Sequence, residues 1–309
     1  MKIIIPDKLD VADHYKNEIR NLGGEVFDDL PDVAELKNRF KDAEIITANY
    51  VDITPDIIDA APNLKYIIVP ANGWEWVDAD YAATKGITTL NAPTHSSQAV
   101  AEHAISLLLA ANRNIVAGST ELRSGKWNPQ ELVGYELAGK KLGLIGYGNV
   151  GTRIEKIAAA LGLEVAYTNS KSTSEGIDNL LSSSDYIIIC APLTDSTRNL
   201  IDERRLNLLK STAILVNVGR GAIINQKDLI QTLKAKKIRG AGIDVFDGEP
   251  LTGTPSAEIV ELASLPNVVA TPHIAYNTAE IHDKQGAEIL VDIQSCLDGR
   301  PINVVKQGV

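Results

Sequence analysis

The sequence predicts an α/β protein with two doubly wound parallel sheets, of the Rossmann or flavodoxin-like kind. Short apolar runs alternate with amphipathic helical stretches along almost the whole chain. This alternation is typical of parallel sheets whose two faces are both covered by helices. The chain has 309 residues, and a second series of strands begins after a long predicted helix. Because a domain commonly has about 100–200 residues, we expect two domains.

The first series of elements contains five buried strands. Runs such as IIIP and YIIVP are apolar throughout, as strands are when both faces of a sheet are covered. We expect strands at 3–6, 25–27, 44–48, 66–70 and 87–91, with helices between the first four. The loop APTHSS then leads into a helix at about 97–118.

The second series again alternates strands with helices. We expect its strands at 142–148, 164–168, 186–192, 213–219, 240–246 and 267–272. A last helix at roughly 278–298 is followed by the tail RPINVV. The pattern therefore gives two α/β domains joined by the long helices near 97–118 and 278–298.

Composition and charge argue against several classes of function. The formal net charge is −10 and the basic residues are scattered, whereas nucleic-acid binding needs a clustered positive face. We find neither the ~18 uncharged apolar residues of a membrane helix nor a secretory signal. Cys190 and Cys296 lie in apolar stretches, far apart in sequence, and no Cys/His cluster has the spacing of metal ligands. We expect no nucleic-acid or membrane partner, no metal, and free thiols in a reducing cytoplasm.

A glycine-rich loop indicates a dinucleotide site. Gly146, Gly148 and Gly151 fit the pattern G-x-G-x-x-G between the strand LGLI and a helix that begins TRIEK. In this context the first glycine allows a tight turn, the second lets the backbone approach a pyrophosphate, and the third lets helix and strand pack closely. The helix N-terminus then favours the negative charge. The alternative is a glycine turn in a Rossmann-like unit that binds no nucleotide.

Three strands of the second series end in polar loops. Arg220 follows the strand at 213–219, Glu249 follows the strand at 240–246, and His273 follows the strand at 267–272. Because carboxyl ends of parallel strands share one edge of a sheet, we expect these side chains to converge beside the glycine loop. Each alone could be a surface charge, a turn residue or a core histidine. Together they suit a carbonyl/hydroxyl reaction: Arg binds a carboxylate, His exchanges the proton, and Glu orients the imidazole.

The loop after the second Rossmann strand bears on the choice of cofactor. An acidic residue commonly stands there, accepts hydrogen bonds from the ribose 2′-OH and repels a 2′-phosphate. Here the position holds Asn169, followed by Ser170, Lys171 and Ser172. We therefore predict that NADP(H) is preferred over NAD(H). The alternatives are a solvated polar loop without preference and an NAD site that uses the Asn169 amide.

The chain resembles the D-isomer-specific 2-hydroxyacid dehydrogenases. The resemblance covers most of the chain from Asn91 to Ala275, in the family's order. Its segments are NAPTHSSQAVAEHAISLLLA, GLIGYGNVG, CAPLTDSTRNLI, LVNVGRGAIINQKDLIQTL, GAGIDVFDGEP and NVVATPHIA. Three places depart from the family: Asn169 replaces the usual acid, Ser96 replaces a common Asn, and Trp74 and Trp76 replace smaller or polar residues. The two tryptophans could pack between domains or shape the pocket.

The resemblance implies an architecture and a set of site residues. Residues 98–284 would form the dinucleotide-binding domain, and 1–97 with 285–309 the substrate domain, with the active site in the interdomain cleft of a homodimer. Arg220, Glu249 and His273 match the family's catalytic residues, and Asn72 and Gly73 match its substrate-carboxylate loop. Beyond the glycines and Asn169, Ser170 and Lys171, the implied cofactor contacts are Asn149, Val150, Ala191, Pro192, Thr197, Val218 and Asp244.

The predicted function is hydride transfer between a nicotinamide cofactor and a small 2-oxoacid or D-2-hydroxyacid, in the reductive direction. Glyoxylate, hydroxypyruvate, pyruvate and larger oxoacids are all candidates. The alternative is a dinucleotide-sensing regulatory protein resembling corepressors of the C-terminal binding protein type. Such proteins typically need a peptide-binding surface, which the sequence does not reveal.

Overall fold

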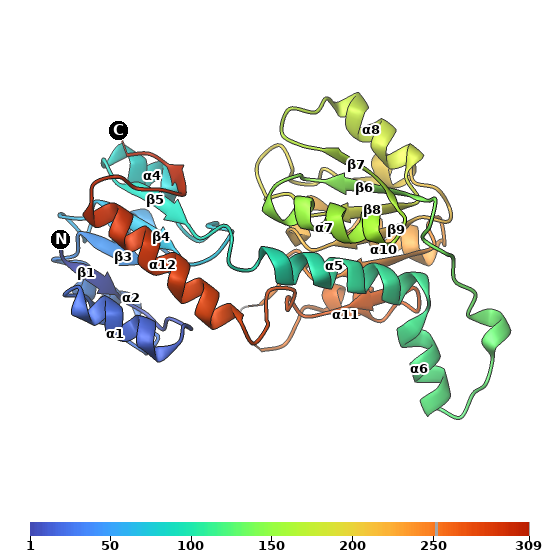
Figure 1. Cartoon of the computed structure of the whole chain (residues 1–309), viewed down its shortest axis with the longest axis horizontal. Coiled ribbons are helices and arrows are strands. Elements are labelled where there is room, and N and C mark those ends of the chain that lie inside the picture. The colour runs from blue at the N-terminus through green and yellow to red at the C-terminus, as the bar shows by residue number, and fades with distance from the viewer. Residues whose placement is uncertain (251–252, 309) are drawn as a thin grey trace. The chain divides into compact units, whose positions relative to one another are not determined.

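The computed structural model describes residues 1–250 and 253–308 of the chain (Figure 1). It divides into two compact units: Met1–Ser96 with Asn277–Val309, and Ser97–Tyr276. Each unit is built on its own six-stranded sheet, so the predicted fold class is confirmed. Among the described residues, we find no helix with the length and hydropathy needed to cross a membrane.

The sheet of the first unit has the strand order β12-β5-β4-β3-β1-β2. All neighbouring pairs are parallel except β12 with β5. Its strands are β1 (Ile3–Ile5), β2 (Glu25–Val26), β3 (Ile45–Thr47), β4 (Tyr66–Val69), β5 (Thr88–Asn91) and β12 (Val304–Lys306). Its helices are α1 (Asp13–Asn21), α2 (Val33–Phe40), α3 (Pro55–Ile58), α4 (Ala79–Thr84) and α12 (Ile281–Leu297).

Helices cover both faces of this first sheet, which explains the continuous apolar strands. Successive side chains of a strand point to opposite faces. Ile4 faces a core formed with α2, α3 and α4, whereas Ile3 and Ile5 face a second core formed with α1 and α12. A strand such as β1 is therefore apolar at every position rather than at every other one.

The sheet of the second unit is entirely parallel, in the order β11-β10-β9-β8-β6-β7. Its strands are β6 (Lys141–Ile145), β7 (Glu164–Thr168), β8 (Tyr186–Ile189), β9 (Ile214–Asn217), β10 (Gly240–Ile243) and β11 (Val268–Ala270). Its helices are α5 (Ser97–Asn112), α6 (Ile115–Arg123), α7 (Asn149–Ala160), α8 (Ser174–Ser183), α9 (Glu203–Leu206), α10 (Gln226–Lys234) and α11 (Ala257–Ala263). After β7 the chain returns to the other side of β6, so the strand order reverses beside β6. Ligands of doubly wound sheets bind at such a reversal.

The structure differs from the sequence-based expectation at two elements. The predicted helix at 97–118 is two helices, α5 and α6, because Asn114 adopts a left-handed conformation with φ of +51°. Asn tolerates this conformation better than most residues. The end of the predicted tail RPINVV continues into the edge strand β12 (Val304–Lys306), which pairs antiparallel with β5.

The boundary between the units also lies elsewhere than the resemblance implied. The resemblance implies that the chain returns to the first unit between residues 284 and 285, whereas in the structure it returns between Tyr276 and Asn277. The reason is that α12 starts at Ile281, and its buried Ile289 and Ile293 belong to the core of the first unit. The helix therefore lies with that unit as a whole.

Candidate active site

The glycine loop connects β6 to α7 and has the form that a pyrophosphate requires. Gly146 has φ of +98°, and a Cβ there would lie 2.6 Å from the backbone nitrogen of Ala191. A Cβ on Gly151 would lie 2.9 Å from the Gly146 carbonyl oxygen. At Gly148 a Cβ would meet nothing within 4 Å. Two glycines thus permit close packing, while the third leaves space above the backbone, so the loop fits a dinucleotide phosphate.

The other predicted cofactor residues follow the carboxyl ends of strands in the same sheet. Asn149 and Val150 begin α7. Ala191, Pro192 and Thr197 come after β8, Val218 after β9 and Asp244 after β10. Thr197 is held in place because its hydroxyl donates to the Pro192 carbonyl at 2.8 Å and accepts from the Thr194 amide at 2.7 Å.

The loop after β7 is an exposed turn formed by Asn169, Ser170, Lys171 and Ser172. The Asn169 side-chain oxygen accepts from the backbone amide of Lys171 at 3.0 Å, and the backbone amide of Asn169 donates to Ser172 Oγ at 3.0 Å. Asn169, Ser170 and Lys171 are all exposed. The turn therefore uses the Asn169 oxygen internally and presents polar side chains to solvent.

An aromatic pair that the sequence analysis missed joins this region to the glycine loop. The rings of Tyr147 and Tyr167 are stacked with centroids 3.7 Å apart and planes 9° apart. The Tyr147 hydroxyl donates to Glu155 of α7. Tyr147 lies between two of the loop glycines and Tyr167 lies just before Asn169, so the stack fixes the loop against the end of β7. The sequence EVAYT of β7 marks Tyr167 only as a strand residue, which is why sequence alone gives no such signal.

Glu249 and His273 form a hydrogen-bonded pair. His273 Nδ1 lies 2.5 Å from Glu249 Oε1, and the Phe246 amide donates to the other carboxylate oxygen at 3.0 Å. Burial raises the pKa of Glu249, but the hydrogen bond and charge of His273, the Phe246 amide and the charge of Arg220 outweigh it and leave this pKa below its ordinary value. The His273 side chain is 41% exposed. A partly exposed imidazole with one nitrogen held by a carboxylate can exchange a proton through the other.

Arg220 lies in a loop that packs closely against the loop bearing Glu249. A Cβ on Gly221 would overlap the backbone of Phe246 and Asp247, so only glycine allows this approach. The Asn217 side chain donates to the Arg220 carbonyl at 3.0 Å, and the Arg220 guanidinium donates to the Gly219 carbonyl at 2.9 Å. The three polar loops that the sequence predicted to converge thus lie together in the second unit.

The loop that carries His273 is anchored by Asp244. This fully buried side chain accepts from the amides of Ile274 and Ala275, both at 3.0 Å, and from the Thr271 hydroxyl at 2.6 Å. Burial raises the pKa of Asp244, but hydrogen bonds from His103 and Thr271 and from the two amides lower it below its ordinary value. Asp244 was predicted as a cofactor contact; its partners His103 and Thr271 were not identified, because they come from distant segments.

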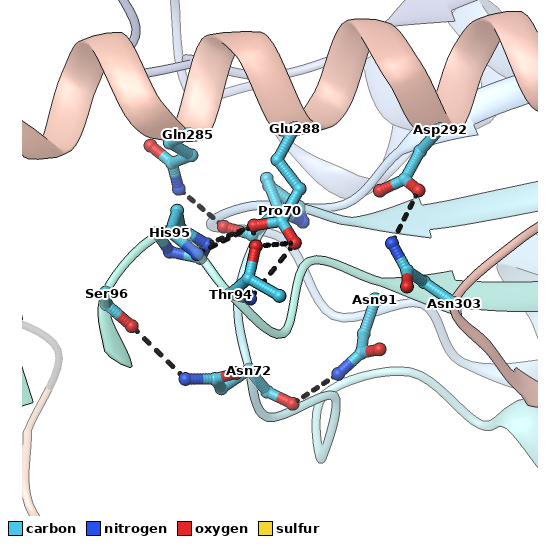
Figure 2. A network of polar contacts seen from close by, with 10 residues as sticks. All are labelled: Pro70, Asn72, Asn91, Thr94, His95, Ser96, Gln285, Glu288, Asp292 and Asn303. Carbon is cyan, nitrogen blue, oxygen red and sulfur yellow. Dashed lines mark hydrogen bonds and ion pairs between the residues drawn. The ribbon is translucent and has the colours of Figure 1, made fainter. Parts of the chain in front are cut away.

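The predicted substrate loop, with Asn72 and Gly73, follows β4 of the first unit. The Asn72 side chain donates to Ser96 Oγ at 3.1 Å, and Asn91 donates to the Asn72 carbonyl at 2.7 Å (Figure 2). Trp74 and Trp76 pack against the core of the same unit, and the Trp76 indole donates to the Ala48 carbonyl at 3.0 Å. Both tryptophans therefore have a packing role within this unit.

The fold and the nucleotide loop are those of a dinucleotide-binding dehydrogenase, and comparison with known proteins agrees. Residues 105–275 match the family model described as D-isomer specific 2-hydroxyacid dehydrogenase, NAD binding domain. A hydroxypyruvate reductase of Thermotoga maritima is 39% identical over 257 residues, 81% of this chain and 83% of that protein. A glyoxylate reductase of Pyrococcus furiosus is 36% identical over 267 residues, 81% of this chain and 78% of that protein.

A solved structure described as an acyclic imino acid reductase (Bsp5) in complex with NADPH and D-Arg is also similar. It has a TM-score of 0.89 and 32% identity, and the match covers 99% of this chain and 100% of that one. The chain belongs to the D-isomer specific 2-hydroxyacid dehydrogenase family, and its second unit contains the nicotinamide-nucleotide domain of that family.

Proposed function

We propose that this protein reduces a small 2-oxoacid to the D-2-hydroxyacid and prefers NADPH as the reductant. The observation that carries the proposal is the Glu249–His273 pair, 2.5 Å apart, beside Arg220 at the carboxyl edge of a sheet that bears a dinucleotide loop. An acid and a cationic fork at that edge suit the reduction of a carbonyl next to a carboxylate.

Substrate binding in this proposal uses two kinds of donor. The backbone amides of Asn72 and Gly73 and the guanidinium of Arg220 bind the oxoacid carboxylate. A guanidinium presents its donors in a planar fork, so Arg220 also polarises the keto oxygen. Together these contacts orient the carbonyl carbon for attack.

Proton transfer is assigned to His273. Glu249 holds Nδ1, so Nε2 is the nitrogen that gives a proton to the keto oxygen as that oxygen becomes a hydroxyl. When bound, the nicotinamide supplies the hydride that goes to C2 of the oxoacid. Glu249 stabilises the charged imidazole before the transfer and keeps the ring oriented afterwards.

The preference for NADPH rests on the turn after β7. Asn169 carries no charge to repel a 2′-phosphate, the exposed Ser170 and the half-buried Ser172 supply hydroxyl donors, and the exposed Lys171 supplies a positive charge. The similar imino acid reductase structure is described as a complex with NADPH, which supports the same preference.

The relatives suggest which substrates to try first. Hydroxypyruvate and glyoxylate come from the names of the two similar reductases. The likeness to an imino acid reductase favours a second candidate, reduction of the imine that an oxoacid forms with an amine. The same acid can protonate an imine nitrogen, so the two candidates share their residues and differ only in substrate.

The family resemblance also leads us to propose a homodimer, and the free thiols of Cys190 and Cys296 lead us to propose the reducing cytoplasm as its location. In the second unit, α6 and the segment after it extend away from the sheet (Figure 1). They expose large apolar side chains, namely Ile115, Val116, Leu122, Trp127 and Val133. Large exposed apolar side chains gathered on one short segment are typical of a protein interface, and a second copy of the chain is the partner we propose.

The proposal is tested by the loss of NADPH or NADH absorbance with a panel of substrates. The panel holds glyoxylate, hydroxypyruvate, pyruvate and larger branched or aromatic oxoacids, each with and without an added amine. Oxidation that needs only the oxoacid supports the proposed function, and oxidation that needs the amine supports imine reduction. Nucleotide binding without turnover of any member would instead favour a dinucleotide sensor.

A further inference from the structure

Three polar residues share one face of α12 in the first unit. Gln285, Glu288 and Asp292 are spaced three and four residues apart, so they lie above one another on the helix. The Glu288 side chain is 10% exposed and Asp292 is fully buried. Burying a polar group costs free energy unless the group is hydrogen-bonded, so we expect these side chains to have hydrogen-bond partners.

The first two residues hold loops at the carboxyl edge of the sheet. The Gln285 amide donates to the carbonyl of Pro70 (Figure 2). Glu288 accepts from the amide and hydroxyl of Thr94, at 3.0 and 2.7 Å, and from the amide of His95 at 2.9 Å. His95 Nδ1 also lies 3.0 Å from the same carboxylate. The segment held in this way continues into Ser96, which accepts from the Asn72 side chain.

Asp292 is connected to Asn72 by hydrogen bonds through two other asparagines. The Asn303 side chain donates to Asp292 at 2.9 Å, and the carbonyl of Asn303 accepts from the Asn91 amide at 3.1 Å. The Asn91 side chain then donates to the carbonyl of Asn72 at 2.7 Å. Hydrogen bonds that start from three residues of one helix face thus reach Pro70 and Asn72, the two neighbours of Ala71 in the chain (Figure 2).

Glu288 is the centre of this network. Burial raises its pKa, but hydrogen bonds from His95 and Thr94 outweigh burial, so the pKa lies below its ordinary value and the group is a carboxylate at neutral pH. Burial raises the pKa of Asp292 to about 7, and the charge of Glu288 adds to this effect. Hydrogen bonds to a charged acceptor are stronger than neutral ones, so the Glu288 contacts hold the Thr94–Ser96 segment most firmly.

We propose that Glu288 is a positioning residue that sets the affinity for the oxoacid carboxylate by holding the Asn72–Gly73 loop through Thr94, His95 and Ser96. The inference rests on the proposed function, in which the amides of Asn72 and Gly73 bind that carboxylate. Backbone donors are effective only when their direction is fixed in advance. A purely structural Glu288 would instead support the fold of the unit without affecting substrate affinity in particular.

Glu288→Gln tests this idea because it keeps the shape of the side chain and removes its charge and one acceptor oxygen. We expect KM for the oxoacid to rise at least about tenfold, the factor that a lost charge-assisted hydrogen bond gives. The kcat at saturating oxoacid and the Kd of NADPH should stay within about twofold, a margin below the effect of one such bond. Amide hydrogen exchange of a peptide covering residues 69–76 should become faster. Glu18→Gln, the same substitution at an exposed position of α1, is the matched control and should change none of these values.

The outcomes separate this inference from the proposed function. A wild type that reduces no oxoacid overturns the proposed function and, with it, the role in substrate affinity. A wild type that reduces oxoacids while Glu288→Gln keeps its KM and its exchange rates overturns the inference alone. A parallel fall in kcat, NADPH affinity and Tm also overturns it, because that pattern reports only a weakened fold. If Glu288→Gln does not fold, Thr94→Val decides in the same assays, since it keeps the shape of the side chain and removes only the hydroxyl donor to Glu288.

Discussion

At the scale of single residues, the backbone of His273 is unusual. Its φ of +52° lies in the left-handed region, which costs a non-glycine residue about 1–2 kcal/mol. The His273 amide donates to the Asp244 carbonyl at 2.8 Å, and the Asp244 side chain accepts from the next two amides. These bonds hold the strained turn in place, and the turn brings His273 to Glu249. The strain is therefore consistent with a residue held for chemistry.

Replacing His273 by Ala tests its role as the acid. We expect kcat to fall by about 10²–10⁴, the usual contribution of general acid–base catalysis. The Kd of NADPH should be unchanged, because the glycine loop belongs to other strands of the sheet. Steady-state kinetics and a fluorescence titration with NADPH measure the two quantities. Turnover close to that of the wild type would eliminate the assignment.

The lowered pKa of Glu249 leads to a prediction about pH. Because the pKa of this carboxyl lies below its ordinary value, Glu249 keeps its charge and its hydrogen bond to His273 until the pH falls through that lowered pKa. We therefore expect the kcat/KM of the wild type to fall on this acid side, where Glu249 becomes protonated. Glu249→Gln has no carboxyl to titrate, so this acid limb should be absent, and kcat/KM at neutral pH should be lower because the imidazole is held less firmly. The profile of kcat/KM against pH shows this directly, and an unmoved profile would leave Glu249 only its hydrogen bond to the Phe246 amide.

At the scale of elements, the sequence was most informative about the strands. Runs such as YIII and ILVN are buried on both faces, so an uninterrupted apolar run was enough to identify them. The edge strand β12 was missed because Val304–Lys306 is short and mostly exposed, and its pairing depends on β5. The apolar pattern continues past the end of α5. The break between α5 and α6 depends on the backbone conformation of Asn114, which the apolar pattern does not show.

The turn after β7 allows a clean test of cofactor preference. In this turn Asn169 Oδ1 accepts from the Lys171 amide, and an Asp oxygen can accept in the same way. Asn169→Asp should therefore add a charge and leave the turn intact. We expect the wild type to have the higher kcat/KM with NADPH and the variant to have it with NADH, because the carboxylate repels a 2′-phosphate. A wild type that favours NADH tenfold would refute the NADPH assignment.

At the scale of the whole molecule, some site residues can be predicted from the sequence and others cannot. Arg220, Glu249 and His273 could be named because each follows a strand of a parallel sheet, and such sheets bind ligands at that edge. The residues that hold them could not be named in this way. His103 lies far along the chain from Asp244, and Glu288 far from Thr94, so their contacts depend on tertiary packing and leave no local pattern.

We propose that this chain makes a D-2-hydroxyacid from a 2-oxoacid, and the configuration of the product is a direct test of this function. Wild-type protein is incubated with NADPH and either pyruvate or hydroxypyruvate, since both products have a stereocentre at C2. The hydroxyacid is then resolved by chiral chromatography. We expect only the D-isomer, in amounts equal to the NADPH oxidised. The L-isomer, a racemate, or nucleotide oxidation without any hydroxyacid would contradict it.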